Sequence, residues 1–323
     1  MGNDNNLEVR LAIVIPAYKK EFLTETLESI ANQTCKEFVL YIGNDQSPYD
    51  LYTIVKKYED KINVIYKSFN ENLGGKDLVA HWIRCVGLVQ KESWIWLFSD
   101  DDIMELNCVE RFYNNLKTKP ESDLMHFNIT VIDKNGKEIE KGNPFPQHLS
   151  IPDFFPKRIK NEIKSTVVEY IFRKSKYIEE GGFANNDLAW CTDDATWIKL
   201  GKTRGIDTIA GAIVKWRYSG TNISAIVDDK TIILRKLNST INHLKWIESY
   251  FIEYGIKDNT SQFDKLKWVT SVFLLTSIFS FTEKYEMTTQ VIKKLKYSNV
   301  KSLAIIYILY LEIKIKLGAK RKS

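Results

Sequence analysis

The chain has 323 residues, of which 44% are hydrophobic and 27% are charged; these proportions are ordinary for a soluble globular protein and leave room for about two domains. Its four cysteines (Cys35, Cys85, Cys108, Cys191) include no CxxC pair, so they suggest neither a zinc site nor a disulfide framework. The net charge of +5 is uneven, because residues 226–323 contain 17 Lys and Arg against 9 Asp and Glu.

Short apolar runs alternate with amphipathic segments in the first part of the chain. We expect buried strands at residues 11–15, 38–42, 63–66 and 94–98. We expect helices between them, at about residues 21–33, 50–58 and 77–89. This alternation predicts an α/β fold, with a mostly parallel sheet that carries helices on both faces.

The pattern changes after residue 119. Prolines at 144, 146, 152 and 156 predict loops in the stretch 119–165, where a lid could form. Further strands are expected at residues 167–172 and 212–218, and from about Asp228 the pattern is helical. We therefore expect an α/β domain over residues 1–225 and an all-helical, basic C-terminal extension over residues 226–323.

Three consecutive aspartates, Asp100, Asp101 and Asp102, follow the apolar run at 94–98. Adjacent carboxylates repel one another, and a divalent cation that carries a phosphate offsets that repulsion. Open α/β sheets also bind their ligands at the carboxyl ends of strands. The cluster therefore predicts a metal and nucleotide site, although Asp102 with Glu105 also fits a helix capping box, which would account for one or two of the aspartates.

Short motifs follow one another in order between residues 9 and 225. They are Ile13–Tyr18, Leu27–Thr34, Asn44–Ser47, Asn72–Gly75, Ser99–Asp102, Gly181–Phe183, Thr192–Asp194, Arg217 and Asn222–Ser224. Among them are sequences that resemble the P-x-Y, D-D-x-S, N-x-G, D-x-D and G-G-F…E-D motifs of the family 2 glycosyltransferases, which have the GT-A fold. Members of that family are inverting enzymes that use nucleotide-sugar donors. Each motif is weak alone, but the ordered set is specific.

The resemblance implies a role for each matching residue. The residues implied to bind the nucleotide-sugar donor are Pro16, Ala17, Tyr18, Asp45, Lys76 and Asp100. Asp101 and Asp102 are implied to hold Mn²⁺ or Mg²⁺ on the donor phosphates, since all-oxygen ligation suits either ion. Asp194 is implied to be the base that takes the proton of the acceptor hydroxyl. Contacts with the donor or acceptor sugar are expected from Asp193, Trp190, Trp197 and Arg217.

Other interpretations of these residues stay open. Asp193 and Asp194 could be first-turn acids of a helix that Thr192 caps, and Asp45 could be an ordinary turn residue. The sequence also departs from the usual family pattern at Lys19, Asn44, Ser99 and Ser219. No arginine follows the loop at 72–74, so Lys76 would take its place as a point charge rather than a fork.

The sequence thus predicts a metal-dependent inverting glycosyltransferase of the hexosyltransferase type. UDP is the nucleotide most common in the family, and the acceptor would be a glycan or a lipid-linked molecule in cell-surface polysaccharide synthesis. One alternative is a binding or assembly subunit that keeps the fold without the activity. Another is a sugar nucleotidyltransferase, but the segment Pro16–Lys20 lacks the glycine-rich, arginine-containing loop of those enzymes.

The C-terminal part concentrates positive charge. Nine basic residues and a single acid, Glu312, lie between Lys293 and Ser323. Two uncharged runs, 268–282 and 302–311, are shorter than the roughly 17–25 residues that span a bilayer, so buried helices are expected. The alternative is an interfacial helix on anionic lipid, anchored by Lys314, Lys316, Lys320, Arg321 and Lys322.

The expected location follows from the same features. The polar start, residues 1–10, does not resemble a signal peptide, and separate cysteines fit a reducing compartment. We expect a cytoplasmic protein, either free or peripheral at the inner face of the plasma membrane. No nucleic-acid partner is expected, because the basic tail has aliphatic rather than aromatic neighbours. Self-association stays open.

Overall fold

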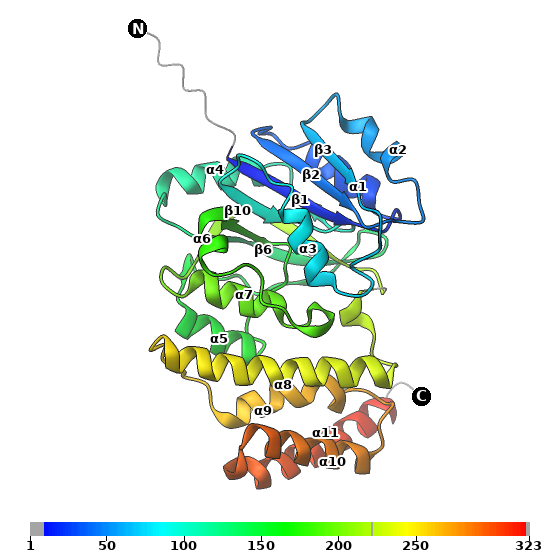
Figure 1. The fold of residues 1–323 in the computed structure, drawn as a ribbon. Helices are drawn as coiled ribbons and strands as arrows, with labels where there is room; N and C mark the ends of the chain where they lie inside the picture. The colour runs from blue at the N-terminus through cyan, green and yellow to red at the C-terminus, as the bar shows by residue number, and fades with distance from the viewer. Residues whose placement is uncertain (1–9, 221, 321–323) are drawn as a thin grey trace. The chain divides into compact units, whose positions relative to one another are not determined.

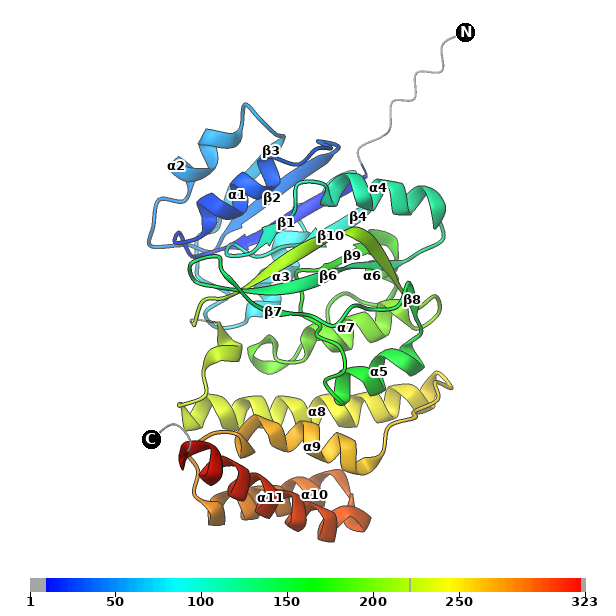
Figure 2. The same ribbon diagram turned by 180° about the vertical axis from the view of Figure 1, so that it is seen from behind.

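The computed structural model describes residues 10–220 and 222–320 (Figures 1 and 2). The chain folds into two compact units. An α/β unit contains the residues up to Ile151 together with 163–185 and 192–219, and a helical unit contains 152–162, 186–191 and the residues from Gly220 onward. The helical unit therefore begins a few residues before the expected boundary at 226, and it includes two short segments from earlier in the chain.

The α/β unit is built on one sheet, which has ten strands within the described residues. The strand order is β3-β2-β1-β4-β9-β6-β10-β5, with β7 paired to β6 and β8 paired to β10. The strands are β1 (Leu11–Ala17), β2 (Phe38–Asn44), β3 (Val64–Ser68), β4 (Trp94–Leu97), β5 (Ile103–Met104), β6 (Leu124–Asp133), β7 (Glu138–Lys141), β8 (His148–Leu149), β9 (Tyr170–Arg173) and β10 (Ile206–Tyr218).

The predicted strands of the first part of the chain form the parallel half of this sheet. β1 pairs in parallel with β2 and with β4, and β2 pairs in parallel with β3. All seven residues of β2 and all four of β4 are buried, as expected for strands that are covered on both faces. β9 runs antiparallel to both β4 and β6, and β10 runs parallel to β6.

The stretch 119–165 is more regular than predicted. β6 occupies residues 124–133 and pairs with β7, β9 and β10, so the sheet depends on it. Its apolar residues precede Pro144 and Pro146, which lie in the loop before β8. Pro152 and Pro156 lie within helix α5 (Ile151–Ile159), so only the first two prolines mark a loop, and the expectation of loops throughout the stretch was wrong.

Helices cover both faces of the sheet. Those of the α/β unit are α1 (Leu23–Ala31), α2 (Tyr52–Val55), α3 (Leu78–Val86), α4 (Cys108–Thr118), α6 (Lys174–Glu179) and α7 (Thr192–Gly201). α3 packs on β1, β2 and β4 from one side, and α1 and α4 contribute to the main hydrophobic cluster on the other (Figures 1 and 2).

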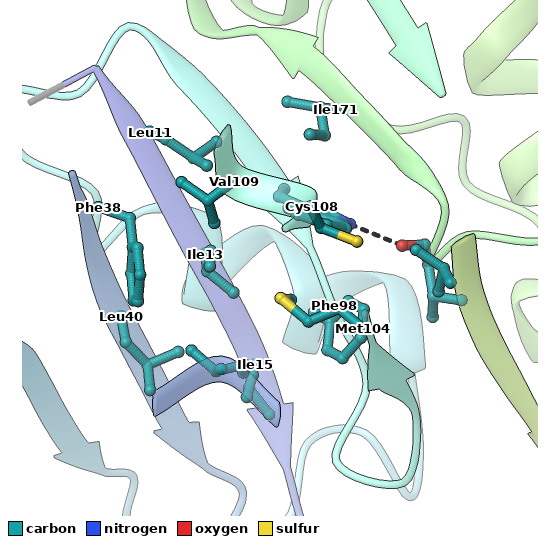
Figure 3. Close-up of a cluster of buried hydrophobic side chains, with 14 of the residues drawn as sticks. Leu11, Ile13, Ile15, Phe38, Leu40, Phe98, Met104, Cys108, Val109 and Ile171 are labelled. Carbon is teal, nitrogen blue, oxygen red and sulfur yellow. Dashed lines mark hydrogen bonds between the residues drawn. The ribbon is translucent and has the colours of Figure 1, made fainter. Parts of the chain in front are cut away.

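The main hydrophobic cluster shows how sequence alternation sets the two faces. Leu11, Ile13 and Ile15 of β1 are completely buried in it, together with Val109 of α4 (Figure 3). Alternate residues of a strand point to opposite faces, so one set of β1 side chains meets α1 and α4 while the other set meets α3. The β1 strand is thereby fixed in the middle of the unit, with its carboxyl end at the site described below.

The helical unit consists mainly of four helices after residue 229, in agreement with the predicted helical extension. Its elements among the described residues are α5 (Ile151–Ile159), α8 (Lys230–Glu253), α9 (Gln262–Leu274), α10 (Phe281–Leu295) and α11 (Lys301–Lys320). Side chains cap the helix starts: Asp229 caps α8, Ser261 caps α9, and Ser280 with Glu283 forms a capping box on α10. None of the helices in the described ranges is long and apolar enough to cross a membrane.

Candidate active site

The aspartate cluster lies directly after β4, as the sequence predicts. Asp100 Oδ2 accepts hydrogen bonds from the backbone amides of Tyr18 and Lys19, both at 2.8 Å. This carboxylate therefore joins the end of β4 to the loop that follows β1. Burial, and then the neighbouring Asp101 carboxylate, raise the pKa of Asp100 to about 6.

Asp102 does not cap a helix. Residues 103–104 form β5, which pairs with β10, and α4 begins later with Asn107 at its N-cap. The capping interpretation was therefore wrong. Asp102 Oδ1 instead accepts a hydrogen bond from the backbone amide of Arg217 at 2.6 Å.

The second carboxylate oxygen of Asp102 is the most unusual atom of the cluster. Asp102 is only 1% exposed, and its Oδ2 has no hydrogen-bond partner within the described residues, although the side chain of Ser99 also stabilises the ionised carboxylate. Burial, and next the charge of Asp101, raise the pKa of Asp102 well above its usual value. A buried carboxylate oxygen without a partner is costly, so this position suits a cation.

Asp101 lies between these two carboxylates and is 5% exposed. Its Oδ2 is 3.7 Å from the ammonium of Lys19, and its backbone carbonyl accepts a hydrogen bond from Arg217 Nε at 2.8 Å. Burial raises the pKa of Asp101, whereas Lys19 and Arg217 lower it. Lys19, at a position where the family pattern commonly has Asn, thus supplies positive charge at the cluster.

Arg217 holds the cluster in place. The side chain is completely buried, and its guanidinium lies over the ring of Phe22 at 4.3 Å. Besides the Asp101 carbonyl it donates to Glu25 Oε2 at 2.6 Å and to the carbonyl of Lys134 at 3.2 Å. These contacts involve α1, the segment after β4 and the segment after β6. The predicted sugar contact of Arg217 does not fit this burial, and we assign the residue a positioning role.

The cluster fits a divalent cation that a substrate helps to hold. The described residues contain no group of three or more His, Cys, Asp or Glu side chains that could bind a metal by themselves. Mg²⁺, however, usually takes only one or two carboxylates from the protein and completes its shell with water and phosphate. Asp101 and the unpartnered Oδ2 of Asp102 supply carboxylate oxygens of this kind.

Asp45 follows β2 and binds the loop at 72–75, which forms a second part of the site. Its carboxylate accepts hydrogen bonds from the backbone amides of Leu73 at 2.9 Å and Gly74 at 2.8 Å, and it forms an ion pair with Arg84. A Cβ at position 74 would lie 2.6 Å from Asp45 Oδ2, so the loop needs glycine here. Asp45 is thus more than a turn residue: it fixes the loop at 72–75.

The segments after β1 and β2 lie side by side. Asp45 N donates to the carbonyl of Ala17 at 2.9 Å, and Ser47 Oγ donates to the carbonyl of Tyr18 at 2.6 Å. Asn44, which replaces the first acid of the family pattern, accepts a hydrogen bond from Ser47 N at 2.8 Å and so shapes the turn. The Tyr18 ring is 38% exposed next to these contacts. The predicted donor residues of these two segments are therefore neighbours.

Arg84 is an important residue that the sequence interpretation missed. Lys76, which was expected to replace the absent arginine after the loop, has an exposed side chain, and its contact with the donor stays a prediction. Arg84 lies on α3. Besides its ion pair with Asp45, its guanidinium donates a hydrogen bond to the carbonyl of Glu71 at 2.9 Å and lies 4.0 Å from the centre of the Phe69 ring. Arg84 Nε also donates to His81 Nδ1 at 3.0 Å, one turn earlier on the same helix, so the signal was a polar pair at i and i+3 within a largely apolar predicted helix.

The two glycines of the G-G-F motif connect that motif to α7. Gly181 and Gly182 have φ values of 73° and 77°, which favour glycine. Lys199 Nζ donates to the carbonyl of Gly182 at 2.9 Å, and the backbone amide of Ala184 donates to Thr196 Oγ1 at 3.1 Å. The motif therefore stabilises the position of α7, the helix that follows it in the sequence.

The acids of this helix differ in exposure. Asp194 lies in the first turn of α7 and is 2% exposed, whereas Asp193 is only half-buried. Acids in a first turn are favoured by the helix dipole, and that interpretation still applies to both residues. The role of Asp194 as the base stays a prediction.

The two tryptophans that were expected to stack on a sugar have other neighbours. Trp197 is completely buried and stacks on Tyr170, with ring centroids 4.4 Å apart. This burial contradicts a sugar platform at Trp197, which belongs to the core. Trp190 lies in the helical unit, where its indole donates to Thr240 Oγ1 at 2.9 Å and Lys236 Nζ lies 4.7 Å from its ring centre.

Proteins of known sequence are similar to this chain. Poly(ribitol-phosphate) β-N-acetylglucosaminyltransferase TarS of Staphylococcus aureus is 32% identical over 97 residues, which are 29% of this chain and 16% of TarS. An uncharacterised glycosyltransferase of Methanocaldococcus jannaschii is 24% identical over 213 residues, which are 64% of this chain and 70% of that protein. The aligned part of this chain thus spans less than a fifth of the length of TarS.

Solved structures share the fold. The 1–349 fragment of S. aureus TarS in complex with UDP-GlcNAc matches with a TM-score of 0.59 at 14% identity, over 96% of this chain and 92% of the fragment. The same fragment in complex with UDP matches with a TM-score of 0.55 at 15% identity, over 97% and 92%. The predicted GT-A fold with a helical C-terminus is therefore confirmed.

The family model for glycosyl transferase family 2 matches residues 12–175. That range runs from β1 through the aspartate cluster and β9 into α6. It contains the contacts of Asp45 and of Asp100 described above, so the ordered motifs and the model identify the same part of the chain. This chain belongs to glycosyl transferase family 2, a family of glycosyltransferases.

Proposed function

We propose that the protein transfers a sugar from a UDP-sugar to a hydroxyl group of a glycan or a lipid-linked acceptor in the synthesis of a cell-surface polymer. The observation that carries this proposal is the cluster Asp100–Asp102, which joins the ends of β4 and β1 and contains a buried carboxylate oxygen without a partner. Family membership supports the reaction class.

The donor and the kind of acceptor are inferred from relatives. TarS has been solved with UDP and with UDP-GlcNAc, and its name describes transfer of N-acetylglucosamine to poly(ribitol-phosphate). The loops after β1 and β2, with Tyr18 exposed between them, would receive the nucleotide. Arg84 and Asp45 would keep the loop at 72–75 in the conformation that borders it.

A divalent cation is part of the proposal. Asp101 and Asp102 would hold Mn²⁺ or Mg²⁺, which would neutralise negative charge on the donor diphosphate. Asp100 would hold the loop after β1 against the cluster through its two amide contacts. Lys19 would add a second positive charge on the same side, because its ammonium already lies 3.7 Å from Asp101.

Asp194 would act on the acceptor. In an inverting transfer the acceptor oxygen attacks the anomeric carbon, the bond from that carbon to the diphosphate oxygen breaks, and a base takes the hydroxyl proton. We propose that the Asp194 carboxylate is this base, a role typically worth about 10²–10⁴ in rate. Asp193 would serve the first turn of α7.

The proposal is tested by release of UDP from a panel of UDP-sugars, measured with and without added glycan or polyol-phosphate acceptors. We expect the Asp194→Asn variant to lose about 10²-fold or more of its turnover, and to bind UDP as the wild type does. Asp193→Asn, one residue away on the same helix, should change turnover much less. Equal turnover of wild type and Asp194→Asn would remove Asp194 from the mechanism. Binding of UDP without turnover on any donor would favour the binding-subunit alternative.

A further inference from the structure

Helix α11 exposes an unusual number of large apolar side chains. Leu303, Ile306, Leu309, Tyr310, Ile313 and Leu317 are each between 46% and 63% exposed, and we call these six residues the α11 face. Single exposed apolar residues are common, but a contiguous group marks an interaction site. The group lies on the last helix of the helical unit, drawn in red in Figure 1.

The α11 face is separate from the side by which the helix packs on its own unit. Ala304, Ile308 and Leu311 are at most 8% exposed and form the packed side, against α9 and α10. Residues 303, 306, 310, 313 and 317 recur at alternating steps of three and four, which places them in one stripe along a helix. α11 is thus apolar on two sides, and its own fold uses only one of them.

Exposed lysines lie on the helix that carries the α11 face and on the adjacent helix α10. Lys301 and Lys314 are exposed on α11 itself, and Lys293, Lys294 and Lys296 are exposed at the end of the adjacent α10. The acid of α11, Glu312, forms a partly buried ion pair with Lys284 at 2.8 Å. On α10, Glu283 pairs with Lys230 at 2.7 Å, and Glu286 is exposed. The surface around the α11 face is therefore strongly basic.

The exposed apolar residues and the nearby lysines together distinguish between two partners for the α11 face, a second copy of the chain and a lipid surface. A second copy of the chain could cover the apolar residues, but two α11 helices packed face to face would bring the exposed Lys301 and Lys314 of both copies toward one another, and like charges repel. A surface of anionic lipid covers the apolar stripe and attracts the lysines at the same time. The charges therefore favour lipid.

We propose that the α11 face binds the surface of membranes that contain anionic lipid, with α11 lying in the interface rather than crossing it. Apolar side chains would enter the boundary of the acyl chains, and the lysines of α10 and α11 would contact the headgroups. This would hold the enzyme next to lipid-linked or membrane-bound acceptors. Of the anchors expected from the sequence, Arg321 and Lys322 lie outside the described residues, as do the side chains of Lys316 and Lys320.

The test is flotation of the full chain with two kinds of vesicle, phosphatidylcholine alone and phosphatidylcholine mixed with phosphatidylglycerol. We expect binding to the anionic vesicles that weakens at high salt. The double variant Ile306→Glu with Ile313→Glu should bind them at least about tenfold more weakly, since it removes two apolar side chains that would enter the membrane and adds negative charge. The matched control is Ile252→Glu on α8, where the isoleucine is 83% exposed in the same unit, and it should bind as the wild type does.

The alternatives give different results. UDP-induced thermal stabilisation should be the same in all three proteins, which would show that the double variant is folded. A wild-type dimer in light scattering that the double variant abolishes, without vesicle binding, would mean that the α11 face pairs with a second copy and would overturn the proposal. Equal vesicle binding by wild type and double variant, equal binding to both lipid mixtures, or no binding at all would also overturn it.

Discussion

Arg217 is the residue on which the geometry of the aspartate cluster depends. It contacts Asp102 through its amide, Asp101 through Nε and Glu25 through its guanidinium, with no exposed surface of its own. Removing one partner of such a network leaves buried polar groups unsatisfied, which costs more than a surface ion pair contributes. Arg217 therefore stabilises the site without being in a position to touch a substrate.

Substitution of Arg217 by methionine tests this role. We expect Arg217→Met to lower the free energy of unfolding by about 2–4 kcal/mol. This loss is smaller than for a fully buried ion pair, because the Glu25 side chain is half-exposed and solvent screens its charge. Urea denaturation measures the change. The control Arg204→Met removes a guanidinium that is 46% exposed, and it should change stability by less than about 1 kcal/mol. Equal losses of stability in the two variants would show that the buried contacts of Arg217 contribute no more to stability than a surface ion pair does.

Single residues also show what the sequence could not reveal. The positions of Asp100–Asp102 and Asp45 at strand ends were predictable, because buried parallel strands have continuous apolar sequences and clear ends. The burial of Arg217 and Trp197 was not, because the groups that cover them come from distant parts of the sequence. Arg84 was missed for the same reason, since it reaches Asp45 from a different element.

Among the elements, the loop at 72–75 depends on a close backbone approach. The amides of Leu73 and Gly74 bind the Asp45 carboxylate, and there is no room for a Cβ at position 74. A side chain there must push the loop away from Asp45. The loop is thus a rigid border of the proposed nucleotide site.

The variant Gly74→Ala tests whether that border matters for binding. We expect its affinity for UDP to fall by about tenfold, because at least one hydrogen bond to Asp45 is lost and the loop is displaced. Titration calorimetry measures the affinity, and thermal unfolding separates it from loss of fold. Ser68→Ala, at the exposed end of β3, serves as the control. Unchanged affinity of Gly74→Ala would exclude this loop from the nucleotide site.

The elements were predicted with uneven success for physical reasons. β1 to β4 were correct because each is a short apolar run between turn residues. β6 was overlooked beside a proline-rich segment, and the capping pattern at Asp102–Glu105 failed because residues 103–104 pair with β10 instead. Pairing with a strand more than a hundred positions away leaves no local signal.

In the whole molecule, stability should depend on pH through buried histidines. His126 of β6 is 1% exposed, with Nδ1 2.7 Å from the Phe127 carbonyl and Nε2 3.0 Å from Thr208 Oγ1. Burial lowers its pKa from 6.5 to about 4. The folded state therefore binds this proton less well than the unfolded state. The stabilising contribution is complete above pH 6.5 and is lost as the pH falls from 6.5 toward 4.

The variant His126→Gln isolates this contribution. Between pH 7 and pH 5 the wild type should lose about 2 kcal/mol more of its free energy of unfolding than His126→Gln does, whatever the absolute stability of the variant. Urea denaturation at both pH values measures the free energy of unfolding. If wild type and His126→Gln lose the same free energy between pH 7 and pH 5, the pH dependence does not come from His126.

The central claim is that the aspartate cluster binds the diphosphate of a UDP-sugar with a divalent cation. The most direct measurement is the thermal shift of wild type and Asp101→Ala with UDP, GDP, dTDP or CMP, each in Mn²⁺, in Mg²⁺ and in EDTA. A nucleotide at 100 times its dissociation constant should add about 2.7 kcal/mol to the stability. We predict a shift with UDP that requires the metal and disappears in Asp101→Ala. A UDP shift of the same size in EDTA and in Asp101→Ala, or no shift with any nucleotide, would contradict the account.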